Sequence, residues 1–260
     1  MPIFDFQKGE VLLIDKPYDW TSFDAVNKVK ITIRKKLRQH LPPAEKGTKV
    51  KLKVGHAGTL DPLATGLLIV CTGKETKNLE NYTAQEKEYT GTFRLGATTP
   101  SFDLEKEIDA TYPTEHITDS MIRDAALQFT GTQLQIPPLF SAIKVGGRRA
   151  YKIARAGKLA EIPAREIVIS EFEITAIRPG EVDFRLVCSK GTYIRALARD
   201  FGAALHSGAH LSALCRTRIG VFELKNAMSL DKFEQACEES FQTKDADRIS
   251  EANQVSPPAH

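Results

Sequence analysis

The sequence has little that could build a disulfide framework or a metal centre. Only four of its 260 residues are cysteines, and no two of them form a C-x-x-C pair. Cys71 and Cys188 end apolar, strand-like runs, which is typical of reduced core cysteines in a cytoplasmic protein. His206 and His210 have the i, i+4 spacing of a metal pair, but Gly208 lies between them and no H-E-x-x-H glutamate is present. We therefore expect no metal site.

The sequence also lacks long apolar runs, and we expect no secretory leader. No apolar run reaches 18 residues, so we expect no membrane span. The first ten residues, MPIFDFQKGE, lack both the basic and the apolar segment of a secretory signal. Together with the cysteine pattern, these absences favour a cytoplasmic location.

Net charge is small, at +3, but the charges are unevenly distributed along the chain. Residues 28–53 carry ten Lys or Arg against one acid, Glu45, whereas the last thirty residues carry seven acids against three bases. A field of this kind can steer a polyanion to one face of a protein. The alternative is a basic segment that is merely solvated.

The most informative stretch is Val54–Cys71, VGHAGTLDPLATGLLIVC. Its apolar end, Leu67–Cys71, predicts a buried strand, and a loop rich in Gly and Pro precedes it. Such a loop can hold one carboxylate, Asp61, at a fixed place against a rigid strand. From spacing alone, the favoured interpretation is that Asp61 caps a turn, and catalysis is the alternative.

The segment GHAGTLDPLATGLL resembles the signature of the TruB family of tRNA pseudouridine synthases, which isomerise uridine 55 in the T loop. Further blocks between Gly9 and Phe222 resemble the same family, namely LLIDKPYDWTSFDAVNKVK, KEYTGTFRLG, QLQIPPLFSAIKVGGRRAYKIARAG, CSKGTYIRALARDFG and AHLSALCRTRIGVF. Fewer than forty residues follow Phe222, too few for the PUA domain of longer members. The resemblance implies a short form of the family.

The resemblance also implies roles for single residues. Asp61 would be the catalytic nucleophile and Arg195 the cation that favours its ionised form. Tyr89 would stack on the target base, and His56 would fill the gap that the flipped base leaves. The motifs also bring two more residues to the base, Tyr193 and Leu214. The isomerisation involves no redox change or net hydrolysis, so we expect no cofactor; whether the aspartate acts at C1′, at C6 or through a glycal stays open.

Without the family, each of these residues has an ordinary structural alternative. A strand tyrosine or leucine such as Tyr89 or Leu214 is usually a core residue, and Arg195 could be a surface helix charge. His56 could be a solvated loop residue. The family's Lys-Pro element supports the active-site loop, so Lys16 is either that support or a solvated lysine.

The pattern of apolar residues and turn signals predicts an α+β protein. Strands are expected at residues 9–16, 67–71, 87–96, 164–177 and 182–188, with helices after Thr21 or Ser22, at 118–129, at 150–156, after a Thr192 cap, and at 229–239. The absence of regular βαβ alternation favours a mixed, largely antiparallel sheet flanked by helices, and the resemblance implies the pseudouridine synthase fold. We expect one catalytic domain over 1–240, with a basic insertion at about 31–53, and a polar, disordered tail over 241–260.

The predicted partner is tRNA, through its T stem-loop, with no obligatory protein partner and a monomeric enzyme. Phosphate contacts are predicted for six basic residues of the insertion and of a hairpin near residue 146, with solvated charges as the alternative: Lys49, Lys51, Lys53, Lys144, Arg148 and Arg149. Two alternative functions stay open. One is a non-catalytic RNA-binding or tRNA-folding protein, and the other is the same chemistry on another RNA, as in the H/ACA-guided relatives.

Overall fold

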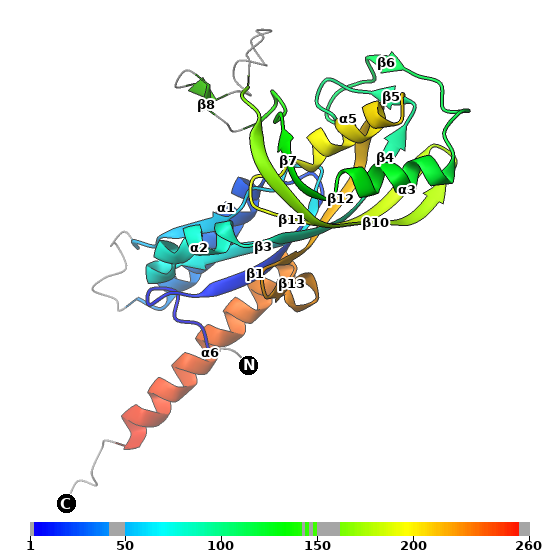
Figure 1. Cartoon of the computed structure of the whole chain (residues 1–260). Helices are drawn as coiled ribbons and strands as arrows, with labels where there is room; N and C mark the ends of the chain where they lie inside the picture. The colour runs from blue at the N-terminus through cyan, green and yellow to red at the C-terminus, as the bar shows by residue number, and fades with distance from the viewer. Residues whose placement is uncertain (1–2, 42–49, 142–143, 146–147, 150–161, 255–260) are drawn as a thin grey trace, which may run out of the picture. The chain divides into compact units, whose positions relative to one another are not determined.

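The computed structural model describes the chain except for residues 1–2, 42–49, 142–143, 146–147, 150–161 and 255–260 (Figure 1). The chain divides into two compact units. One comprises Met1–Thr83 and Phe222–His260, and the other Ala84–Val221. The single domain predicted over 1–240 stays a prediction.

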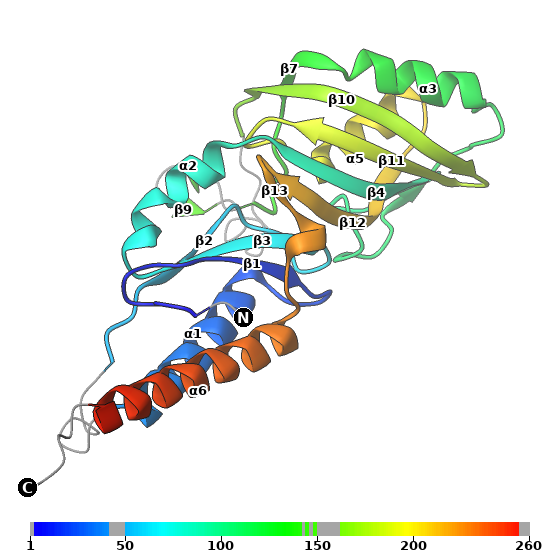
Figure 2. The ribbon, with the colours of Figure 1, turned by 90° about the horizontal axis from the view of Figure 1, so that it is seen from below.

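The first unit packs two helices against three strands. Strand β3 (Thr65–Thr72) pairs antiparallel with β1 (Val11–Lys16) and with β2 (Val54–Ala57). Helices α1 (Ser22–Gln39) and α6 (Leu230–Gln254) lie side by side next to β1, as Figure 2 shows. A 3-10 turn (Gly73–Asn78), α2 (Leu79–Ala84), β13 (Phe222–Glu223) and a second 3-10 turn (Leu224–Asn226) complete the elements.

The core of the first unit forms where α1 and α6 meet β1 and β3. Val29 and Ile33 of α1 have no exposed surface and pack with Phe233 and Cys237 of α6 in one apolar cluster. Ion pairs also join the two helices, and Lys28 Nζ lies 2.8 Å from Glu234 Oε2. Acids of α6 thus neutralise part of the basic charge that the sequence concentrates in α1.

The second unit is an antiparallel sheet covered on one face by helices. The strand order is β12 (Ala209–Ile219), β4 (Lys87–Leu95), β11 (Glu181–Cys188), β10 (Arg165–Arg178) and β7 (Gly131–Gln135). Helices α3 (Asp119–Gln128) and α5 (Ile194–Ala204) lie on the same face (Figure 1). Two short hairpins are attached, β5 (Ala97–Thr98) with β6 (Ala110–Thr111) and β8 (Lys144–Val145) with β9 (Arg148–Arg149).

The predicted α+β class and the antiparallel character of the sheet are confirmed. The helix predicted after Thr21 or Ser22 is confirmed too, because α1 runs to Gln39 and Ile33 is buried in the core, so the first part of the basic stretch at about 31–53 is helical. One prediction is corrected. Residues 241–254, predicted as part of a disordered tail, continue α6 to Gln254, and Phe241 is buried against Phe6. A helix predicted at 150–156 lies outside the described residues.

Candidate active site

The loop that carries Asp61 joins β2 to β3 in the first unit. Asp61 is half-buried, and its backbone carbonyl accepts a hydrogen bond from Ala64 N at 3.1 Å. This bond closes a turn around Pro62, as the Asp-Pro pair predicts. The loop therefore presents the carboxylate at a tight turn that ends directly in a core strand.

The two residues that flank this carboxylate are each held by another segment. Leu60 N donates to Ser22 Oγ at 2.8 Å, and Ser22 Oγ donates to Leu60 O at 3.0 Å. On the other side, the Pro62 carbonyl accepts from Asp19 N at 3.0 Å and from Lys16 Nζ at 3.2 Å. The backbone is thus fixed on both sides of the aspartate.

Lys16 is a buried cation next to this loop. Its side chain has no exposed surface, and Nζ also donates to Pro17 O at 2.9 Å and to Trp20 O at 2.6 Å. A buried ammonium needs such acceptors, because burying an uncompensated charge is costly. The prediction that Lys16 supports the loop is confirmed, and the alternative of a solvated lysine is wrong.

His56 lies in the first unit too. It is half-buried on β2, opposite Val70 of β3. The structure therefore places His56 and Asp61 in one unit, on a strand and on the loop that follows it. The role that the resemblance gives to His56 stays a prediction.

In the second unit, Tyr89 and Leu214 lie on neighbouring strands and share one face of the sheet. Leu214 of β12 is directly opposite Gly91 of β4, and opposed residues of an antiparallel pair point to the same face. Tyr89, Gly91 and Phe93 are spaced two residues apart on β4 and therefore face the same side of the sheet. The centre of the Phe93 ring lies 5.3 Å from that of Phe201 on α5. Both residues are therefore on the face that α5 covers.

Arg195 lies in the first turn of α5 and is only 5% exposed. Its Nη1 donates to Ser101 O at 3.1 Å and its Nη2 to Phe140 O at 3.0 Å, while Nε is 3.5 Å from Asp103 Oδ2. Partners on three sides fix the plane of the guanidinium. The alternative of a surface helix charge is therefore wrong.

Tyr193 is the N-cap of α5 and is held by Gln135. Tyr193 N donates to Gln135 Oε1 at 2.8 Å, and Gln135 Nε2 donates to Tyr193 O at 3.1 Å. The Arg165 guanidinium lies 5.8 Å from the centre of the Tyr193 ring, within cation–π range. The predicted cap, Thr192, is wrong, because its hydroxyl instead donates to Ser189 O at 3.0 Å.

Two further cations are buried beside Tyr89, and the sequence analysis missed them. Arg216 is directly opposite Tyr89, and Lys87 lies two residues before it on the same face. Burial lowers the pKa of Lys87 to about 8, and the charge of Arg216 adds to this effect. A signal was available, because both residues lie in the blocks that supplied Tyr89 and Leu214.

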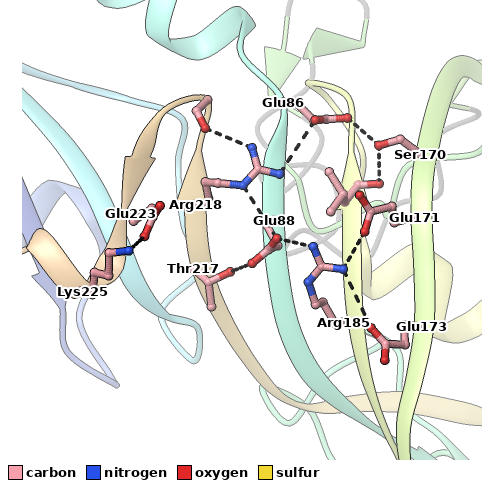
Figure 3. Close-up of polar contacts among 12 residues, drawn as sticks. Glu86, Glu88, Ser170, Glu171, Glu173, Arg185, Thr217, Arg218, Glu223 and Lys225 are labelled. Carbon is pink, nitrogen blue, oxygen red and sulfur yellow. Dashed lines mark hydrogen bonds and ion pairs between the residues drawn. The ribbon is translucent and has the colours of Figure 1, made fainter.

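The opposite face of the same sheet carries a network rich in acids, shown in Figure 3. Arg185 bonds Glu88 at 2.7 Å and Glu171 at 2.6 Å. Burial opposes ionisation of Glu88, but hydrogen bonds from Thr217 and Arg185 outweigh it and lower its pKa. The acidic and basic members of the network are Glu86, Glu88, Glu171, Glu173, Arg185 and Arg218. With four acids against two bases, this network carries a net negative charge.

The predicted phosphate contacts are only partly described. The six residues are Lys49, Lys51, Lys53, Lys144, Arg148 and Arg149. Lys51 and Lys53 are exposed before β2, whereas Lys49 lies outside the described residues. The last three lie on the hairpin of β8 and β9, but their side chains are not described. The contacts with RNA stay predictions.

Among the residues that the structure describes, no group of three or more His, Cys, Asp or Glu could hold a metal ion. The described helices also include none that is both long and apolar enough to cross a membrane.

Comparison with protein families gives two matches that together cover most of the chain. Residues 45–194 match the N-terminal domain of the TruB family pseudouridylate synthases. Residues 195–252 match the C-terminal domain of tRNA pseudouridylate synthase B.

Similar proteins are known from sequence and from structure. The tRNA pseudouridine synthase B of Flavobacterium johnsoniae is 55% identical over 232 residues, 89% of this chain and 97% of its own length. That of Phocaeicola vulgatus is 56% identical over 229 residues, 88% of this chain and 93% of its own. A chain of a Cbf5-Nop10-Gar1 complex matches 87% of this chain with 28% identity and a TM-score of 0.63. This chain spans about half of that one, 53% of its length, and the expected fold is confirmed.

Proposed function

The chain belongs to the TruB family of pseudouridylate synthases, and on that premise we propose that it isomerises uridine 55 of the tRNA T loop with Asp61 as the nucleophile. The observation that carries the proposal is the loop of Asp61. Its flanking residues are anchored to other segments, so the backbone that carries the carboxylate is restrained, which favours the fixed position that a nucleophile needs.

The reaction rearranges bonds within one nucleotide. The bond between N1 of uracil and C1′ breaks, the base rotates, and a bond between C5 and C1′ forms. N1 gains a proton and C5 loses one, so nothing is oxidised or hydrolysed. A carboxylate suits this series of bond changes because it can form a covalent intermediate and then leave. We assign Arg195 the role of favouring the ionised carboxylate.

The target uridine has to leave the stack of the T loop before it can react. Extruding a base costs a few kcal/mol, and stacking on an aromatic side chain offsets about 1–3 kcal/mol of this. We assign Tyr89 and Tyr193 to contact with the extruded base, Leu214 to its packing, and His56 to the space that it leaves. We also propose that the enzyme acts in the cytoplasm as a monomer and needs no protein partner.

Replacement of Asp61 tests the proposal. Asp61→Asn keeps the shape of the side chain but removes the nucleophile, so pseudouridine at position 55 should fall to background while binding to tRNA persists. Asp231→Asn is the matched control, because it makes the same change at an exposed site in the first turn of α6. Normal turnover by Asp61→Asn would show that the mechanism is wrong.

Mapping of pseudouridine separates the alternatives. With bulk tRNA as substrate, we expect the enzyme to add pseudouridine at position 55. Binding of tRNA without any new pseudouridine would indicate a non-catalytic RNA-binding protein, and modification only in another RNA would indicate a different substrate.

A further inference from the structure

Ser22 is the first residue of α1 but does not cap that helix. The cap is Thr21, whose Oγ1 accepts from Asp24 N at 3.0 Å, while the Asp24 carboxylate accepts from Thr21 N at 3.0 Å. This reciprocal capping box leaves no capping task for the neighbouring hydroxyl. The Ser22 side chain is nevertheless buried, with 2% exposure.

The hydroxyl of Ser22 bonds to both backbone groups of Leu60, which is 38 residues away. It accepts from Leu60 N at 2.8 Å and donates to Leu60 O at 3.0 Å. A serine hydroxyl has one proton, so its donor capacity is fully used on this one residue. Leu60 is only 3% exposed, so it is held through its backbone N–H, its carbonyl and its buried side chain.

These bonds act directly on the geometry of the catalytic residue. The Leu60 carbonyl belongs to the planar peptide that joins Leu60 to Asp61, so fixing that oxygen fixes the plane from which Asp61 begins. On the far side, Asp19 and Lys16 hold the Pro62 carbonyl. The Leu60–Asp61 peptide before the aspartate and the Pro62–Leu63 peptide, one residue beyond it, are therefore both anchored.

We propose that Ser22 is a positioning residue for catalysis, whose hydroxyl fixes the Leu60–Asp61 peptide and thereby aims the carboxylate. The inference rests on the proposed role of Asp61. A positioning role differs from a purely stabilising one in its effect on rate. Displacement of a reacting group by about 1 Å can cost about 100-fold in rate even when the protein stays folded. Loss of the hydroxyl should thus reduce the chemical step in protein that is still folded.

The test compares two neighbouring hydroxyls at the start of α1. Ser22→Ala releases the loop, and Thr21→Ala removes the helix cap but leaves the Leu60 contacts in place. With a T-arm RNA as substrate and below the melting temperature of every variant, kcat of Ser22→Ala should fall about 10- to 100-fold. The KM should change less than about threefold, because the change affects the reacting group and not the RNA-binding surface.

The control and a second variant keep the outcome decisive. Thr21→Ala should lower the melting temperature and leave kcat within about twofold of wild type. If Ser22→Ala does not fold, Ser22→Cys retains a small side chain with much weaker hydrogen bonds, and the same fall in kcat is expected. A folded Ser22 variant with wild-type kcat, or one in which only KM changes, would overturn the inference.

Asp61→Asn, measured in parallel, separates this inference from the proposed function. An inactive Asp61→Asn together with a fully active Ser22→Ala would refute the positioning role alone. An active Asp61→Asn would refute the proposed nucleophilic role of Asp61, and the positioning role of Ser22 with it.

Discussion

Replacing Gln135 by Met should destabilise the second unit and impair catalysis together. Gln135 is 2% exposed and forms two hydrogen bonds with the backbone of Tyr193, at 2.8 and 3.1 Å. Methionine has a similar length, but it forms no such hydrogen bond with the N–H or the carbonyl of Tyr193. Tyr193 O keeps its bond from Leu197 N at 3.0 Å, whereas Tyr193 N loses the acceptor that it has in the wild type.

The magnitude follows from this difference. Each of the two lost hydrogen bonds is worth about 0.5–1.5 kcal/mol net, and the part-buried N–H left without its acceptor brings the sum toward its upper end, so the free energy of unfolding should fall by about 2–3 kcal/mol. Gln133→Met on the same strand is the control. It removes a single bond, from Gln133 Nε2 to Phe129 O at 2.6 Å, so it should cost about 1 kcal/mol and leave activity unchanged.

Urea denaturation and single-turnover pseudouridine formation would measure the two effects. A third variant, Gln135→Glu, keeps the acceptor for Tyr193 N, and its second oxygen can donate to Tyr193 O only when protonated. Its stability relative to wild type should therefore be higher at pH 5 than at pH 8. Equal destabilisation by Gln135→Met and Gln133→Met, with full activity in both, would refute the reasoning.

Two other predictions concern charge. The pKa of Lys87, lowered to about 8 from an ordinary 10.5, means that the unfolded chain binds more protons between these values. Stability should therefore rise by up to about 3 kcal/mol as pH increases from 8 to 10.5, and denaturation curves of Lys87→Met should lack this rise. Lys51 and Lys53 are exposed, so replacing both by Ala should weaken tRNA binding and reduce the slope of log Kd against log salt by about 1.5. An unchanged slope would show that neither contacts a phosphate.

Local signals predicted much of the fold. Apolar periodicity and turn residues gave the positions of β1, β3, β4, α1 and α3 to within a few residues, because these elements bury the residues that define their pattern. The end of α6 was missed although a signal existed. Leu230, Phe233, Cys237 and Phe241 recur at helical spacing and are all buried, so the apolar stripe already runs past residue 239.

The candidate site was predicted through its motifs, but its supports were not. Asp61 and Arg195 lie in blocks that identify the family. Hydrogen bonds restrain the backbone next to Asp61 and the side chain of Arg195. The bond from Ser22 to Leu60 spans 38 residues, and that from Gln135 to Tyr193 spans 58. Spacing in sequence cannot show such contacts, because they exist only after separate segments have packed.

The two supports solve the same physical problem in different units. Hydrophobic burial is strong but not directional, so it can place Leu60 in the core without fixing how the next peptide turns. Hydrogen bonds depend steeply on angle, so a buried hydroxyl or amide that binds both backbone groups of one residue restrains orientation as well as position. Ser22 does this for the residue before Asp61, and Gln135 does it for Tyr193, two residues before Arg195. Substitutions at these two positions should therefore cost more activity per unit of lost stability than apolar substitutions in the core.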